Sequence, residues 1–379
     1  YGSLMMSKMG HAGVTCMDCH DPHTNGHILP FENNALCMRC HGSGLQDAPK
    51  INPTAHSHHP ANSTGNQCVE CHMPVTLFMG RDGRRDHSFS SPDPELTLEL
   101  GIPNACSQCH NTQSVEWAKR FPDEWYGPDM NADRRSKARL MDSLWSGMSG
   151  ADARLRAALE TEENRFWKST FVSMLQYTQP NAETIGILEA AVEDPDPMVR
   201  TAAVQVLGTE SLPPQTAKTL QLDPVRGVRI ASALASQSLA TANSETEAEL
   251  AAYLTHTADS PMGALRLSAF RQSRGDAEAA RASARQATRF EPLNPEVWRL
   301  AAIELHGLGA STEAMDYLAK ALKLDPDNAQ VLFNRGLLDY ELGNTAAAFT
   351  DLLAAVQADP TFESAWYNLI VLYWQQGQQ

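Results

Sequence analysis

Four short stretches of the chain place cysteine and histidine at one fixed spacing. In each stretch two cysteines are separated by two residues and followed at once by a histidine: Cys16, Cys19 and His20; Cys37, Cys40 and His41; Cys68, Cys71 and His72; Cys106, Cys109 and His110. This C-x-x-C-H pattern is the attachment signature of c-type haem. Two thioethers hold one edge of the rigid macrocycle, and the next imidazole reaches the iron. The spacing therefore predicts four covalent c-type haems, each with its motif histidine as the proximal iron ligand.

Zinc and disulfides are the alternative uses of paired cysteines. Four pairs could make two Cys₄ zinc sites, but zinc does not require a histidine after every second cysteine. Disulfides leave the same histidines unexplained. Since the chain has 8 cysteines and all lie in these motifs, haem attachment accounts for every one.

The second axial position of each iron decides between two kinds of chemistry. A second strong ligand gives a closed electron carrier, whereas an open position gives a catalyst. Seven further histidines lie in the first 110 residues: His11, His23, His27, His56, His58, His59 and His87. They are numerous enough for bis-histidine coordination of all four irons. Methionine is a weaker alternative, because it more often fills gaps between apolar groups.

Charge and hydropathy exclude two other classes of protein. The chain has 379 residues and a net charge of −15, which is unsuited to a nucleic-acid backbone. No apolar run approaches the 18 or so residues of a membrane span. Thioether attachment is completed outside the cytoplasm, so we expect an exported protein, periplasmic or extracellular. Residues 1–15 lack a signal-peptide pattern, which indicates a removed signal or a longer precursor.

The elements that hold these motifs are expected to be mostly loops. Four haems on residues 1–128 leave too little chain to enclose each macrocycle, so the haems are expected to pack on one another. Residues 129–258 have helical periodicity and resemble HEAT repeats, with Val199, Ala203 and Leu207 on one helix face. A plain helical bundle is the alternative for this middle segment.

The last segment, residues 259–379, repeats every 34 residues. Gly275, Gly309 and Gly343 keep this step, which is the period of tetratricopeptide (TPR) repeats. Three units and the first helix of a fourth are expected, so the fold class is mainly α, a loop-rich tetrahaem domain followed by an α-solenoid. The final helix is apolar on all sides around Trp366 and Trp374, so a partner, a neighbouring copy or a continuation of the chain is expected to cover it.

Several motifs together resemble a known family. Asp21-Pro22-His23 follows the first haem motif, and Arg84-Arg85-Asp86-His87 lies between the third and the fourth. These residues resemble exported multihaem cytochromes of the doubled-CXXCH kind with C-terminal TPR repeats, which are distantly similar to nitrite-reductase-type cytochromes. The resemblance implies distal iron ligands at His23, at His59 with His58 next, and at His87.

Three functions are consistent with this sequence. The first is an electron carrier with four closely packed bis-histidine haems, whose helical repeats dock redox partners or sister subunits. The second is a subunit of an extracellular filament with a continuous haem chain. The third is an enzyme that reduces or oxidises small nitrogen compounds at one open haem, although no lysine replaces a motif histidine. An electron-transfer protein is favoured over an enzyme.

Overall fold

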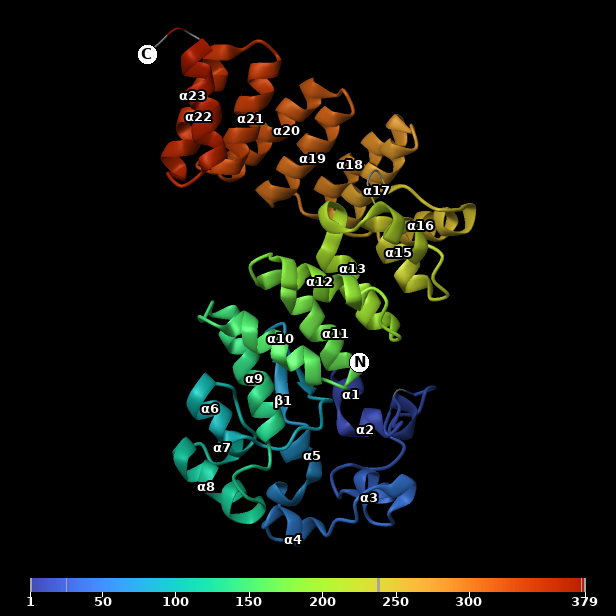
Figure 1. The fold of residues 1–379 in the computed structure, drawn as a ribbon. Helices are drawn as coiled ribbons and strands as arrows, with labels where there is room; N and C mark the ends of the chain where they lie inside the picture. Colours follow the sequence, from blue (N-terminus) through green and yellow to red (C-terminus); the bar gives the residue numbers. More distant parts are fainter. Residues whose placement is uncertain (1, 25, 237–238, 376, 378–379) are drawn as a thin grey trace. The chain divides into compact units, whose positions relative to one another are not determined.

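The computed structural model describes residues 2–24, 26–236, 239–375 and 377. The chain is mainly helical, as predicted, and it folds as two compact units, Tyr1–Val206 and Leu207–Gln379 (Figure 1). No helix within the described ranges is long and apolar enough to cross a membrane. The predicted boundaries at residues 128 and 258 remain predictions.

The segment with the haem motifs consists of short helices joined by loops, as the sequence predicts. Its elements are α1 (Gly2–Met6), α2 (Lys8–His11), α3 (Ala35–His41), α4 (Pro53–Ser57), α5 (Cys68–His72), α6 (Pro94–Leu100), α7 (Cys106–Cys109) and the antiparallel strands β1 (Val75–Phe78) and β2 (Asp82–Arg85), with single 3-10 turns at Cys16–Asp18, Leu45–Asp47 and Thr64–Asn66.

Longer helices complete the first unit: α8 (Val115–Tyr126), α9 (Ala132–Trp145), α10 (Ala151–Thr161), α11 (Arg165–Met174), a 3-10 turn at Leu175–Tyr177, α12 (Ala182–Ala191) and α13 (Pro197–Ser211), whose end lies beyond the unit boundary. A buried ion pair joins α9 to the haem segment. The Arg135 guanidinium lies 2.9 Å from Asp93 and 2.6 Å from Glu95, and its side chain is 7% exposed. Because a buried charge is costly without its partner, this pair fixes α9 against the start of α6.

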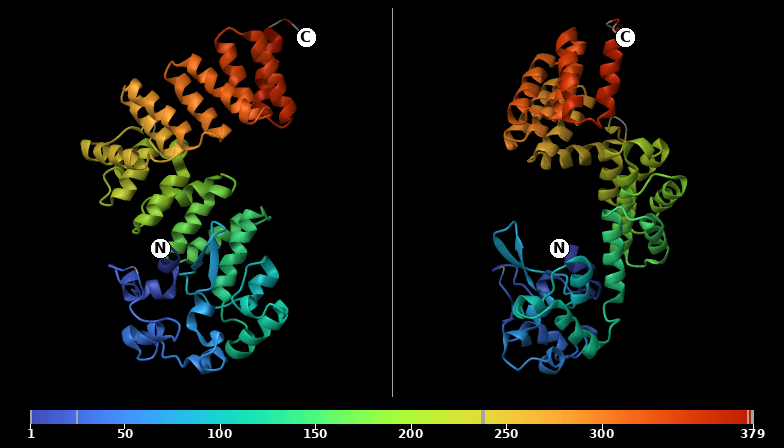
Figure 2. Two further views of the ribbon diagram at one scale, coloured as in Figure 1. Left: turned by 180° about the vertical axis from the view of Figure 1, so that it is seen from behind. Right: turned by 90° about the vertical axis from the view of Figure 1, so that its left-hand side faces the viewer.

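The second unit is an array of antiparallel helices (Figure 2). It contains α14 (Pro214–Leu220), α15 (Arg226–Leu234), α16 (Ser244–His256), α17 (Pro261–Ser273), α18 (Ala277–Phe290), α19 (Pro295–Gly307), α20 (Ser311–Leu324), α21 (Ala329–Glu341), α22 (Thr345–Ala358) and α23 (Glu363–Gln375). The 34-residue repeat corresponds to the pairs α17/α18, α19/α20 and α21/α22, followed by α23. Gly275, Gly309 and Gly343 each directly follow the C-cap residue of the first helix of a pair, with φ between 75° and 83°, a conformation that glycine adopts without strain.

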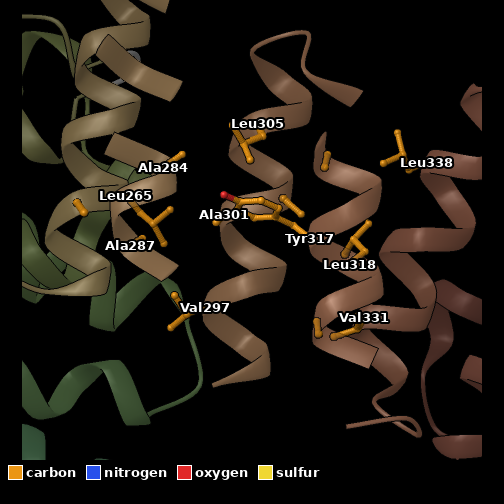
Figure 3. Packing of buried hydrophobic residues seen from close by; sticks show 14 residues of the cluster. Leu265, Ala284, Ala287, Val297, Ala301, Leu305, Tyr317, Leu318, Val331 and Leu338 are labelled. Atoms are coloured by element: carbon orange, nitrogen blue, oxygen red, sulfur yellow. The ribbon is translucent and has the colours of Figure 1, made fainter. Parts of the chain in front are cut away.

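Small residues allow the two helices of each repeat to approach closely. Ala280, Ala314 and Ala348 are fully buried. Figure 3 shows larger side chains from successive pairs, such as Leu265, Leu305 and Leu338, meeting in one continuous core. In the middle segment Val199, Ala203 and Leu207 are also buried, as expected for one face of a helix.

The last helix, α23, has one buried and one exposed apolar face. Leu369 and Leu372 pack against α22, whereas Tyr367 is 70% and Trp374 is 81% exposed. The expectation that another molecule or a continuation covers the exposed face remains a prediction.

Candidate haem-binding site

Three of the four haem motifs lie on short helices. The second and third motifs form the end of α3 and the whole of α5, and the fourth forms α7 with His110 directly after it. The first motif begins in the 3-10 turn at Cys16–Asp18. One helical turn places cysteines three residues apart on the same side of the chain, where both can reach one edge of a macrocycle. All eight cysteines are free thiols, so each can form a thioether.

Three motif histidines each have a second histidine ring about 6 Å away. The ring centroids are 6.3 Å apart for His20 and His87, 6.0 Å for His72 and His56, and 6.0 Å for His110 and His59. Imidazoles on opposite sides of one metal ion have centroids about 6 Å apart, because each bond is about 2 Å long and each ring adds about 1 Å. These separations therefore fit one iron between the rings of each pair.

The orientation of the rings agrees with metal binding. The Nδ1 atoms donate to backbone carbonyls of Ser90 from His72, of Ser57 from His59 and of Arg85 from His87, at 3.1, 2.6 and 2.9 Å. A ligating histidine commonly fixes its ring in this way and presents the other nitrogen to the metal. Burial lowers the pKa of His72 and of His56 and so favours the neutral imidazole, the form that binds a metal.

The fourth motif histidine, His41, has a different environment. Its Nδ1 donates to the Pro49 carbonyl at 3.0 Å, as in the pairs described above. In the described part of the chain, however, no ring contact joins His41 to another histidine. His41 remains the predicted proximal ligand at this motif.

The four histidines that the sequence selected as distal ligands have different surroundings in the structure. His59 and His87 face motif histidines. His58 instead stacks directly on Trp125, with centroids 4.0 Å apart and too close for an intervening metal. His23 is exposed on the loop that the His20–His27 bridge closes. His56 lies opposite His72, although the family resemblance did not select it. The sequence offered only its position, twelve residues before the third motif, as an indication that it lies near that haem site.

The remaining two histidines of the set of seven make other contacts. His27 lies 5.0 Å from His20 and 4.9 Å from the Phe31 ring, measured between centroids. His11 stacks on Phe166 at 5.8 Å and lies 3.2 Å from the Asn164 amide. Both rings therefore lie against neighbouring protein groups.

Contacts between successive motifs bring their attachment edges together. The thiols of Cys37 and Cys68 form a hydrogen bond, which lowers the pKa of Cys68 to about 7 and, with burial, raises the pKa of Cys37. The Arg39 guanidinium of the second motif donates to the Asp18 carbonyl of the first at 3.3 Å. In the third motif Glu70 pairs with Arg85 at 2.6 Å. The first three motifs are thereby linked side by side.

These residues fit a c-type haem. The motif cysteines are free thiols, and three imidazole pairs have centroid separations that suit an intervening iron. The Nδ1 of His20 is buried without a partner among the described residues. Bound haem supplies an iron that is reversibly oxidised and reduced. The fold and the motifs define a multihaem c-type cytochrome with a TPR segment.

Comparison with known proteins agrees with this class. A profile of the cytochrome c552 family matches residues 52–252, more than half of the chain, and the protein belongs to this family. Profiles of the doubled CXXCH motif and of a tetratricopeptide repeat match residues 10–45 and 296–328. No curated protein gives a significant match.

Solved structures similar to this chain are repeat proteins. A crystal structure of MamA has 17% identity, covers 34% of this chain and 74% of its own, and gives a TM-score of 0.29. The first TPR of Spaghetti (RPAP3), bound to an HSP90 peptide, has 15% identity, covers 31% and 95%, and scores 0.28. The TPR protein YrrB has 16% identity, covers 51% and 84%, and scores 0.27.

Proposed function

We propose that the protein carries electrons along four closely packed c-type haems. The observation that supports this function most directly is the set of three imidazole pairs with ring centroids 6.0 to 6.3 Å apart. An iron held between two imidazoles has no position for a substrate and changes only its oxidation state. On this proposal His87, His56 and His59 are the distal ligands opposite His20, His72 and His110.

The helical repeats have a second role in this proposal. The HEAT-like middle segment and the TPR segment dock redox partner proteins or sister copies, since stacked helix pairs present extended surfaces for protein binding. Because haem is attached outside the cytoplasm, the protein acts in the periplasm or at the cell surface. The exposed aromatic side chains of α23, Tyr367 and Trp374, favour association into an oligomer or filament.

The alternative of an enzyme depends on the haem at His41. If its distal position is open, small nitrogen compounds could bind there, as the family resemblance implies. We favour the carrier, because three of the four motif histidines already face a second imidazole.

Haem content, spin state and potential together test the proposal. The purified protein should contain four haems in a pyridine haemochrome assay, give electron paramagnetic resonance (EPR) signals dominated by low-spin ferric haem, and titrate reversibly. High-spin signals from two or more haems in the fully loaded protein would contradict the carrier function. Fast turnover of nitrite or hydroxylamine would favour the enzyme instead.

A further inference from the structure

Asn34 lies at the start of the helix that bears the second haem motif. It is 5% exposed and precedes α3 with φ 63° and ψ 3°, a left-handed conformation that asparagine tolerates better than most residues. Its backbone carbonyl accepts from the Met38 N–H at 2.8 Å and so begins the hydrogen bonding of this helix. The main chain of Asn34 is therefore part of the helix that carries the second motif.

The side chain of Asn34 binds to the third motif. Its Nδ2 donates to the Asn66 carbonyl and its Oδ1 accepts from the Cys68 N–H, both at 2.8 Å. The amide thus uses a donor and an acceptor on the two residues that flank the start of α5. Aspartate lacks the donor and leucine lacks both groups, so an amide satisfies this position best.

The hydrogen bonds continue beyond the third motif. Asn66 Nδ2 donates to Ser57 Oγ at 3.0 Å, at the end of α4. The same α4 carries His56, which faces His72, and the Ser57 carbonyl accepts from His59 Nδ1 at 2.6 Å. One network therefore joins the second motif, the third motif and the segment that bears two facing imidazoles.

The two motifs that Asn34 joins also have adjoining attachment points. The Cys37 and Cys68 thiols, which become thioethers when haem is attached, interact closely enough that each shifts the pKa of the other. The haem edges held by these sulfurs must consequently lie close together. Electron exchange between two haems depends steeply on their separation, so the groups that fix these sulfurs also control that exchange.

We propose that Asn34 is a positioning residue that sets the separation between the haem on Cys37, Cys40 and His41 and the haem on Cys68, Cys71 and His72. The proposal rests on the proposed electron-carrier function. It concerns the coupling between two particular haems rather than the presence of either one.

Two substitutions and a matched control test this role. Asn34→Gly keeps the left-handed backbone without strain and removes both side-chain hydrogen bonds. Asn34→Asp keeps the acceptor for the Cys68 N–H and places a carboxylate oxygen against the Asn66 carbonyl. Asn62→Gly is the control, because Asn62 has φ 64° in the same haem segment but is exposed.

The measurements are haem content, EPR spin–spin interaction between haems and the separation of the apparent midpoint potentials. In Asn34→Gly we expect four bound haems, a weaker spin–spin interaction and a shift of at least two of the potentials. Asn34→Asp should give smaller changes in the same direction, and Asn62→Gly should match the wild type. Loss of a haem from Asn34→Gly leaves Asn34→Asp as the deciding variant.

Two outcomes separate this inference from the proposed function. Suppose first that the wild type shows interacting low-spin haems. If Asn34→Asp, and Asn34→Gly when it is fully loaded, then keep the wild-type interaction and potentials, Asn34 has only a structural role and the inference is wrong. A lower melting temperature alone would not rescue it. If the wild-type haems themselves do not interact, the electron-carrier proposal fails first.

Discussion

The Gly65→Ala substitution should remove the distal ligand from one of the four proposed haems. Gly65 lies in the 3-10 turn at Thr64–Asn66, directly against the His59 ring. A Cβ at this position would lie 2.2 Å from His59 Cδ2 and 2.8 Å from its Nε2. Since real Cβ atoms essentially never come within 3.0 Å of such atoms, the ring or the turn must move by at least 0.8 Å.

A displacement of this size is larger than an iron–imidazole bond tolerates, since ligand distances in metal sites stay within about 0.2 Å of their ideal values. The His59 ring cannot yield freely, because its Nδ1 is held 2.6 Å from the Ser57 carbonyl. If His59 is the distal ligand opposite His110, the haem on Cys106 and Cys109 should become five-coordinate. About one quarter of the total haem should then change from low to high spin.

EPR of the ferric protein measures this fraction directly, after a haemochrome assay has shown four haems per chain. Gly186→Ala is the matched control, because Gly186 lies in α12 and has nothing within 4 Å of an added Cβ. His59→Ala should give the same high-spin fraction, and the double variant should add little to it. A fully loaded Gly65→Ala protein with the wild-type low-spin spectrum would refute the assignment of His59.

Three further predictions concern other groups. His56→Ala should turn the haem at His72 high-spin by EPR, whereas His58→Ala should leave all spin states unchanged and reduce thermal stability by about 1 kcal/mol through loss of stacking on Trp125. Arg135→Ala should lower the free energy of unfolding by about 3–5 kcal/mol in urea titrations, because it leaves a buried carboxylate unpaired; equal effects from Arg120→Ala at its exposed ion pair would contradict this. Burial raises the pKa of Glu304, so its ionisation destabilises the fold fully above the folded-state pKa and not below its ordinary value of 4.5. Glu304→Gln should therefore raise the melting temperature at pH 7, and this gain should disappear as the pH falls to about 4; a gain independent of pH would be inconsistent with this cause.

Spacing in the sequence predicted the features that depend on short-range geometry. The haem motifs span five residues each, and one helical turn determines what they can hold. The 34-residue step of Gly275, Gly309 and Gly343 likewise predicted the helix pairs, since each glycine follows the end of a helix at a fixed place in its repeat. Both patterns reflect contacts between residues close in the chain.

The facing histidines could not be derived in the same way, because they lie far from their partners in the sequence. His87 follows the hairpin of β1 and β2, and this hairpin determines where its ring lies relative to His20. Nothing in the sequence around either residue identifies the other as its partner. His58 and His59 are adjacent and chemically identical, yet one stacks on Trp125 and the other faces His110. Only the direction of the chain after α4 separates them, and that direction depends on tertiary contacts such as Asn66 with Ser57.

The imidazole pairs have a consequence for how this segment stays folded. An iron bound by His20 and His87 would cross-link residues 67 positions apart, and this loop contains the second and third motifs. Closing a loop of that length removes unfolded-state entropy equivalent to about 4 kcal/mol by the estimate used for disulfides. Each axial bond would then act as a reversible cross-link in a segment with few apolar residues to bury. Haem loading, oxidation state and conformational stability would be thermodynamically linked, and a chain that lost one axial bond would unfold more easily around its neighbours.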